Sequence, residues 1–272
     1  MSIIQAVFFD LGDTLVKISD VTLTKICKRI SGFRSTPLNT DEYTRVWINE
    51  WVKRSSPSET KLIKDIKTDA SERLYWKYFV ESLFPSLGIS SDQPELIEWL
   101  IDIYTSPQSL VCFDDVHQVL SELKNKNLTL GIISNAFPST DKILDHLNLR
   151  QYFKYIFLSF ELPFAKPEPQ IYQFAAEKTN IPIENIIFID DRWSFVKGAQ
   201  EANMNAWLIE RFSEEQSGLF TKSLVNKIKN LKEIMEIVGF SQVEEINTSQ
   251  EQKPSSSTHG DEFWNICELP IK

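Results

Sequence analysis

The chain has 272 residues, of which 42% are hydrophobic and 25% are charged, as is typical of a globular protein. Its formal net charge of −9 argues against a nucleic-acid-binding surface, and no apolar run approaches the ~20 residues that span a bilayer. Three cysteines (Cys27, Cys112 and Cys267) lie far apart and are odd in number, which argues against a disulfide framework or a structural zinc site. Because the first ten residues also lack a basic leader and a cleavage site, we expect a cytoplasmic protein without nucleic-acid or membrane partners.

The first predicted element is a buried strand over residues 3–9, which ends at the turn-like letters DLGDT of residues 10–14. From residue 19 to residue 108 the chain is helical in pattern and unusually aromatic. Aromatic residues spaced four apart, which lie on one face of a helix, are Trp47 and Trp51, and Tyr75 and Phe79. We interpret residues 19–108 as an all-helical cap domain with an aromatic core. Its insertion after the first strand places it where it can exclude water and select substrates.

Strands and helices alternate in the rest of the core, which we assign to residues 1–18 and 109–238. Predicted strands cover residues 128–133, 155–158, 185–189 and 206–209, and predicted helices cover residues 116–125, 140–147, 170–179 and 195–202. This alternation indicates βαβ units and therefore a parallel sheet with helices on both faces. The expected fold is a doubly wound, Rossmann-like α/β core with the helical cap inserted into it.

The last part of the chain changes character. Residues 222–232 alternate lysine with apolar residues at helical spacing, which we interpret as a solvated helix face. Residues 239–262 are polar and predict a disordered linker. Residues 263–272 are apolar again, and they either dock on their own domain or bind a protein partner.

Polar residues directly follow three of the predicted strands. Asp10 follows the first strand, Ser134 and Asn135 follow the second, and Asp190 and Asp191 follow a later one. If only one of these residues were present, the simplest explanation would be that it caps the N-terminus of the following helix. The carboxyl ends of parallel strands meet at one edge of a sheet, where ligands bind in open α/β folds, so together these residues predict a site. A lone buried carboxylate is also unfavourable, and a metal ion shared with Asp190 would give Asp10 a partner.

These residues, with Lys166-Pro167 before a predicted helix, resemble the motifs of the haloacid dehalogenase superfamily of hydrolases in order and spacing. The resemblance covers about residues 3–212 and includes a helical cap of the kind that this superfamily often carries. It implies a magnesium-dependent phosphatase that hydrolyses a small phosphorylated metabolite through an aspartyl-phosphate intermediate.

The resemblance also implies roles for individual residues. Asp10 would be the nucleophile, and Ser134 and Lys166 would complete the catalytic group by stabilising charge on the phosphate oxygens. The implied ligands of Mg²⁺ are the Asp10 carboxylate, the main-chain carbonyl of Gly12, Asp190 and Asp191. The implied phosphate- and substrate-binding residues are Thr14, Ser134, Asn135, Lys166 and Arg192.

Two departures from the family pattern leave alternatives open. The phosphatases of the superfamily usually carry a general acid–base Asp two positions after the nucleophile, a group worth about 10²–10⁴-fold in rate, and here that position is Gly12. Phe195 stands where Asn or Asp often supports the metal loop. Both favour a catalytically weak or inactive binding or regulatory protein as the alternative. A 2-haloacid dehalogenase is a weaker one, because a metal-free site gains nothing from the charges of Asp190 and Asp191.

Overall fold

A computed structural model describes residues 3–54, 63, 65–212 and 225–239 of the chain. At its centre is a sheet of six strands in the order β5-β4-β1-β6-β7-β8, and all neighbouring strands are parallel. The predicted α/β fold, with a Rossmann-like parallel sheet and an inserted helical cap, is confirmed. The strands are β1 (Ala6–Phe9), β4 (Thr129–Ser134), β5 (Tyr155–Leu158), β6 (Ile186–Asp190), β7 (Asn205–Ile209) and β8 (Asn226–Ile228).

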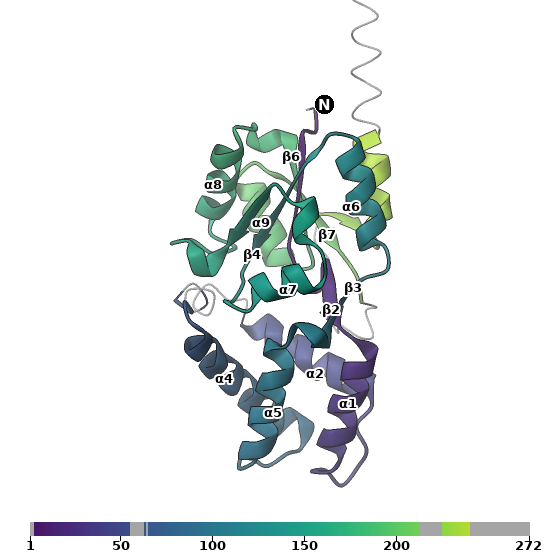
Figure 1. The fold of residues 1–272 in the computed structure, drawn as a ribbon, viewed down its shortest axis with the longest axis vertical. Coiled ribbons are helices and arrows are strands. Elements are labelled where there is room, and N and C mark those ends of the chain that lie inside the picture. The colour runs from purple at the N-terminus through teal and green to yellow at the C-terminus, as the bar shows by residue number, and fades with distance from the viewer. Residues whose placement is uncertain (1–2, 55–62, 64, 213–224, 240–272) are drawn as a thin grey trace, which may run out of the picture.

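Helices cover both faces of this sheet (Figure 1). The side chains of β1 show why the strand is apolar throughout. Val7 and Phe9 pack into a hydrophobic cluster on one face, whereas Ala6 and Phe8 pack into a second cluster on the other. The first face carries α6 (Val116–Asn125), α7 (Thr140–His146) and a helix over residues 232–239, and the second carries α8 (Pro169–Thr179) and α9 (Trp193–Glu201).

Strand β1 occupies the point where the strand order changes direction. The chain adds β4 and β5 on one side of β1, and β6, β7 and β8 on the other. The carboxyl ends of β1, β4 and β6 therefore lie next to one another, and they carry Asp10, Ser134 and Asp190. Such a switch point is where open α/β sheets bind their ligands.

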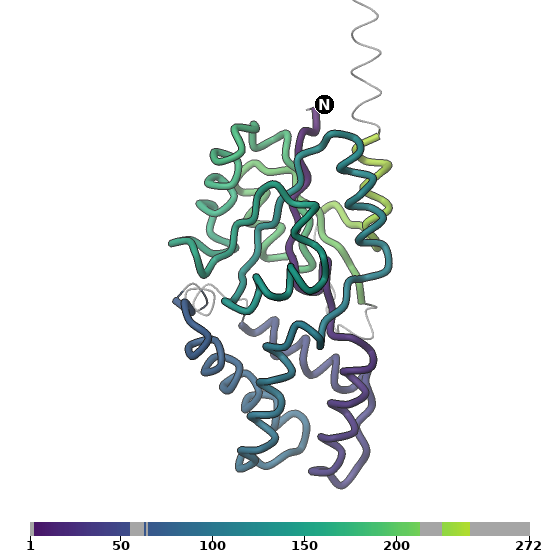
Figure 2. The backbone as a smooth tube through the Cα atoms, viewed as in Figure 1, coloured from purple at the N-terminus to yellow at the C-terminus, as the bar shows by residue number. Residues whose placement is uncertain are grey.

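A helical domain stands at this carboxyl edge, below the sheet in the traces of Figures 1 and 2. It has a hydrophobic cluster of its own, built around residues such as Phe79, Leu83 and Leu100. The two chain segments that lead into and out of this cap pair as a short antiparallel ribbon of β2 (Val16–Ile18) and β3 (Leu110–Cys112). Among its described residues, the helices of the cap are α1 (Asp20–Ser31), α2 (Thr40–Lys53), α4 (Asp69–Leu87) and α5 (Pro94–Thr105).

Local sequence sets the ends of these helices. The side chains of Ser19 and Asn39 accept hydrogen bonds from backbone N–H groups in the first turns of α1 and α2. Thr68 starts α4 with a reciprocal capping box that includes Ser71. Gly88 ends α4 in the left-handed conformation (φ 67°), which glycine adopts without strain.

Several short elements were not predicted. Strands β2 and β3 have three residues each and exist through their mutual pairing. The interpretation of residues 222–232 as a helix face was wrong for β8, which pairs with β7 at the edge of the sheet. In β8 the lysine is exposed and Ile228 is buried, as expected for a strand with two different faces. The 3₁₀ helices are η1 (Pro107–Ser109), η2 (Arg150–Tyr152), η3 (Ser159–Glu161) and η4 (Ile183–Asn185).

The predicted linker and the apolar segment after it, residues 239–272, lie outside the described residues apart from Gly239, which belongs to the helix over 232–239. Within the described ranges, no helix is both long and apolar enough to cross a membrane.

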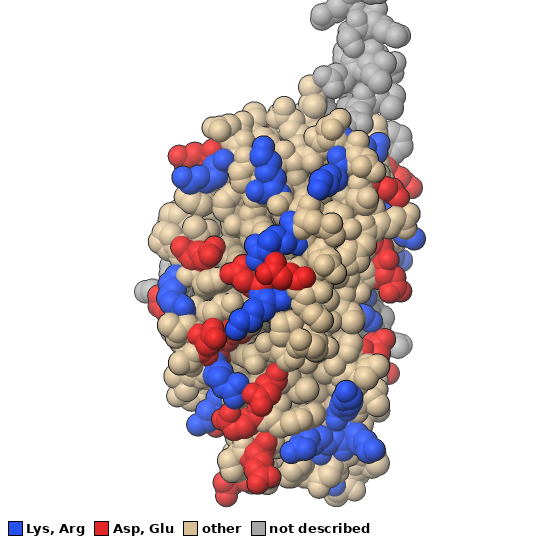
Figure 3. Space-filling model, in the orientation of Figure 1, with Lys and Arg blue, Asp and Glu red and all other residues tan. Residues whose placement is uncertain are grey.

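Acidic and basic side chains are interspersed over much of the face in Figure 3. Exposed ion pairs of the molecule include that of Arg150 with Asp141 and Asp145. Basic side chains gather at one end of the cap, over α1, where the exposed basic residues are Lys25, Lys28 and Arg29. Charges of both signs on one surface are typical of a solvated face.

Candidate active site

Asp10 begins the loop that joins β1 to β2. Its backbone N–H donates to the carbonyl of Ile189 on β6 at 2.8 Å, which extends the pairing of the two strands by one residue. The loop then turns sharply, with the N–H of Asp13 donating to the carbonyl of Val16 at 2.8 Å. Asp13 adopts the left-handed conformation (φ 57°), which Asp tolerates better than most residues. The rigid strand thus fixes the backbone of Asp10, whose carboxylate is almost buried at the sheet edge.

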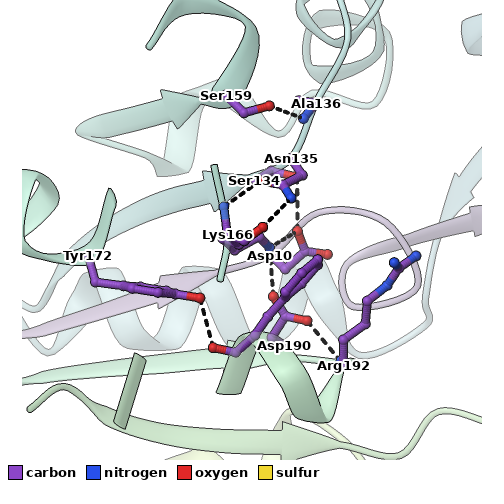
Figure 4. A network of polar contacts seen from close by, with 10 residues as sticks. Asp10, Ser134, Asn135, Ala136, Ser159, Lys166, Tyr172, Asp190 and Arg192 are labelled. Carbon is purple, nitrogen blue, oxygen red and sulfur yellow. Dashed lines mark hydrogen bonds and ion pairs between the residues drawn. The ribbon is translucent and has the colours of Figure 1, made fainter. Parts of the chain in front are cut away.

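The ammonium group of Lys166 lies between two carboxylates (Figure 4). Lys166 Nζ is 2.5 Å from Asp10 Oδ1 and 2.6 Å from Asp190 Oδ2. Ser134 Oγ donates to the same Asp10 oxygen at 2.9 Å. Burial alone would lower the pKa of Lys166, but the charges of Asp10 and Asp190 hold it above its ordinary value. The fold therefore brings together four sequence-predicted residues from four separate segments of the chain.

Backbone contacts fix the position of Lys166. The Lys166 N–H donates to Asn135 Oδ1, and Asn135 Nδ2 donates to the Lys166 carbonyl, both at 2.8 Å. Gly198 of α9 allows Pro167 to approach, since a Cβ at residue 198 would lie 2.5 Å from the Pro167 carbonyl oxygen. In this structure the amide of Asn135 is therefore engaged in positioning Lys166.

Carboxylates gather beside the Lys166 ammonium. One carboxylate oxygen from each of Asp10, Asp190 and Asp191 lies within 4.8 Å of the others. Burial raises the pKa of Asp190 to about 6, and burial with the nearby charge of Asp190 raises the pKa of Asp191 well above its ordinary value. Two buried carboxylates and the half-buried one of Asp191, which repel one another, form a donor set suited to a divalent cation with oxygen ligands. The residues present therefore fit magnesium.

Gly12 and Thr14 lie on the loop after Asp10 but contribute no side chain to this group. Gly12 is exposed, and a Cβ there would meet no atom within 4 Å. Thr14 is fully buried, and its Oγ1 has no hydrogen-bond partner among the described residues. The space next to Gly12 is therefore open, whereas the Thr14 side chain is packed inside the protein.

Arg192 connects the site to the cap. Its backbone N–H donates to Asp190 Oδ1 at 2.8 Å, and its guanidinium carbon lies 4.9 Å from the ring centre of Trp51 on α2. The ring centre of Phe195, which is buried, lies 5.3 Å from the same carbon and 4.9 Å from Lys166 Nζ. Aromatic rings thus pack against both cations of the site.

Sequence reasoning missed Arg211, which braces the loop after Asp10. Its guanidinium donates to the Thr14 carbonyl at 2.9 and 3.1 Å and to Asp115 Oδ2 at 2.8 Å. Burial opposes ionisation of Asp115, but hydrogen bonds from Arg211 and from the Leu231 N–H hold its pKa below its ordinary value. The partners of Arg211 are 96 and 197 residues away in the chain, so no local pattern indicates it.

We expect Arg211→Met to lower the free energy of unfolding by about 3–5 kcal/mol, because it leaves the Asp115 carboxylate buried without its cation. Denaturant unfolding followed by circular dichroism measures the change. Arg150→Met is the matched control, since Arg150 forms exposed ion pairs whose loss changes stability by about 1 kcal/mol or less. Equal losses in the two variants would contradict the bracing role of Arg211.

The doubly wound sheet, the inserted cap and the polar group at the switch point define a Rossmann-like α/β protein with a capped candidate active site. The family model of haloacid dehalogenase-like hydrolases matches residues 4–203, and the chain belongs to this family.

Relatives of the chain include two named phosphatases. Phosphatase MT3486 of Mycobacterium tuberculosis is 26% identical over 79% of this chain and 92% of that protein. Glyceraldehyde 3-phosphate phosphatase of Methanothermobacter thermautotrophicus is 25% identical over 85% of this chain and 100% of that protein. A solved L-2-haloacid dehalogenase matches 88% of this chain and 100% of its own, with a TM-score of 0.67 and 16% identity. This structural likeness shows the shared fold.

Proposed function

We propose that this protein is a magnesium-dependent phosphatase that hydrolyses a small phosphorylated metabolite through an aspartyl-phosphate on Asp10. The observation that carries the proposal is the Lys166 ammonium, which lies 2.5 Å from Asp10 and 2.6 Å from Asp190. A buried lysine between two carboxylates supplies positive charge where phosphoryl oxygens would gather. The phosphatases among the relatives support the same class of reaction.

The reaction would proceed by two displacements at phosphorus. A carboxylate oxygen of Asp10 attacks and forms an O–P bond, the bond from phosphorus to the leaving oxygen breaks, and that oxygen takes a proton from water. Water then attacks phosphorus, the aspartyl O–P bond breaks, and inorganic phosphate leaves. Ser134 Oγ, which now donates to Asp10, would donate to a phosphate oxygen when substrate is bound. Lys166 would hold a second oxygen of the phosphate.

The charge balance of the site supports the need for a cation. In the part of the chain that the structure describes, four carboxylates lie in or beside the site, against two side-chain cations. The carboxylates are Asp10, Asp13, Asp190 and Asp191, and the cations are Lys166 and Arg192. Asp10, Asp190 and Asp191, with the main-chain carbonyl of Gly12, would hold Mg²⁺. When bound, the ion supplies positive charge that offsets the charge of the phosphate group.

We expect phosphate release from an aryl phosphate to fall about tenfold or more when EDTA removes magnesium, and to recover when Mg²⁺ is added back. Magnesium should also raise the Tm of the wild type, because an ion that binds only the folded state stabilises it, but not that of Asp190→Asn. Turnover that EDTA leaves unchanged would contradict the proposal. Absence of turnover would favour the binding or regulatory alternative, and metal-free halide release from a 2-haloacid would favour the dehalogenase.

A further inference from the structure

Glu72, on α4 of the cap, is a buried carboxylate at the boundary between cap and core. Its side chain is 2% exposed. Glu72 Oε2 accepts the backbone N–H of Ser139 at 2.9 Å, and Glu72 Oε1 accepts Ser139 Oγ–H at 2.5 Å and Trp76 Nε1–H at 3.3 Å. All of these donors are neutral. A buried carboxylate bound in this way loses hydration that a surface position would keep, so its place in the interface calls for an explanation.

Ser139 belongs to the core and lies five residues after Ser134. The segment 134–139 starts at the candidate active site, leaves β4 and ends at the beginning of α7, which lies at the boundary with the cap in Figure 1. Phe137, in the middle of this segment, is buried in the hydrophobic cluster of the cap. Its ring centre lies 4.9 Å from that of Tyr75 and 5.2 Å from that of Trp76. The cap thus holds the far half of the segment by both polar and apolar contacts.

The segment itself is tightly bonded, so a constraint at one end can reach the other. The Ala136 N–H donates to the buried Ser159 Oγ at 3.1 Å (Figure 4). The Phe137 N–H donates to Thr140 Oγ1 at 3.3 Å, and the Thr140 N–H returns to the Phe137 carbonyl at 2.9 Å. Ser139, which Glu72 contacts, therefore lies only five residues along the chain from Ser134, whose hydroxyl contacts Asp10.

We propose that Glu72 is a positioning residue: by holding Ser139 it fixes the segment 134–139, and through it Ser134 Oγ, for binding of the phosphate group. The proposal rests on the proposed function, since it assigns to the cap a share in oxyanion binding within the same site. Under this proposal, Ser134 is correctly placed only while the cap is closed on the core. Opening the cap then removes a phosphate contact and helps the product to leave.

The test compares binding of orthovanadate, a phosphate analogue, to the magnesium-loaded full chain and its variants. Glu72→Gln keeps the size of the side chain but removes the charge and one acceptor. We expect it to raise the inhibition constant of vanadate about tenfold, which is the size of effect expected for the loss of a charged hydrogen bond. Asp69→Asn is the matched control on the same helix, because it breaks an exposed cap–core pair with Lys142 (3.7 Å) and should change inhibition less than about twofold.

A double-mutant cycle shows whether Glu72 acts through Ser134. If it does, Glu72→Gln should weaken vanadate binding less than about twofold when Ser134 is already replaced by Ala. Equal losses in both backgrounds, or no loss in either, would overturn the role of Glu72. Ser139→Ala, which removes one donor to Glu72 and leaves the backbone contact, serves the same comparison if Glu72→Gln does not fold.

Amide hydrogen exchange gives a readout independent of activity. Peptides that cover residues 136–140 should exchange about tenfold faster in Glu72→Gln than in the wild type, with Asp69→Asn unchanged. Unchanged exchange in Glu72→Gln would also overturn the proposal. A wild type that neither releases phosphate nor binds vanadate would instead overturn the proposed function, and exchange would still report on the Glu72 contact.

Discussion

The Asp10→Asn variant is expected to lose about 10⁴-fold or more of kcat for phosphate release, because an amide cannot act as the attacking oxygen. The substitution keeps the size of the side chain and one oxygen. That oxygen can still accept from Lys166 Nζ and Ser134 Oγ, as Asp10 Oδ1 does now. The variant should therefore fold, and its loss of activity would reflect the chemistry at residue 10. Initial rates with an aryl phosphate measure the effect.

Two further measurements make the result specific. Asp114→Asn, the same change at an exposed aspartate, should leave kcat within about twofold of the wild type. Rapid acid quench with a phosphate-labelled substrate should leave label on the wild type and none on Asp10→Asn. Label retained by the variant would show that another residue is the nucleophile.

The Gly12→Asp variant is expected to gain activity, by about 10²-fold in kcat/KM for an alkyl phosphate. In the wild type no side chain stands at this position to give a proton to the leaving oxygen. A Cβ at residue 12 meets no atom within 4 Å, so the first atom of a side chain there displaces no neighbour. An alkoxide needs a proton as it leaves, whereas a phenolate with a low pKa does not. The gain should therefore be only a few-fold for an activated aryl phosphate.

Gly12→Asn is the control for this prediction, since it has the same shape and cannot transfer a proton in the same way. It should show no gain with either substrate. Equal rates for the Asp and Asn variants would mean that the proton comes from elsewhere in the site. The ratio of aryl to alkyl turnover in the wild type then also indicates which leaving groups the natural substrate carries.

The sequence was informative where function depends on strand ends. Asp10, Ser134 and Asp190 each follow an apolar run whose length and composition are typical of a buried strand, and parallel strands align their carboxyl ends. Their placement at one edge of the sheet could therefore be predicted without knowledge of the strand order, whereas their proximity depends on β4, β1 and β6 being neighbours. The aromatic residues of α2 and α4 were likewise predicted to share helix faces, and the rings of Trp47 and Trp51 stack with centres 5.3 Å apart.

Contacts that join distant segments of the chain could not be predicted from the sequence, because no local pattern indicates them. Glu72 occupies a helix position that a surface glutamate could equally fill, and its partner Ser139 is 67 residues away. Arg211 depends on a carbonyl oxygen, which carries no sequence signal at all. Strands of three residues, such as β8, are too short for their period to differ from that of a helix.

The ribbon of β2 and β3 has a consequence for how this chain could diversify. The cap has its own hydrophobic cluster and joins the core through these two adjacent strands, so exchange of the cap for another helical unit leaves the packing of the parallel sheet intact. Contacts between cap and core outside the ribbon limit such an exchange, and one of them is Phe137, a core residue that is buried in the cap cluster. A chimera that grafts a foreign cap at the ribbon would thus have to re-match the packing of Phe137, the Glu72–Ser139 hydrogen bonds and the contact of Trp51 with Arg192, and recombination in evolution would meet the same constraints.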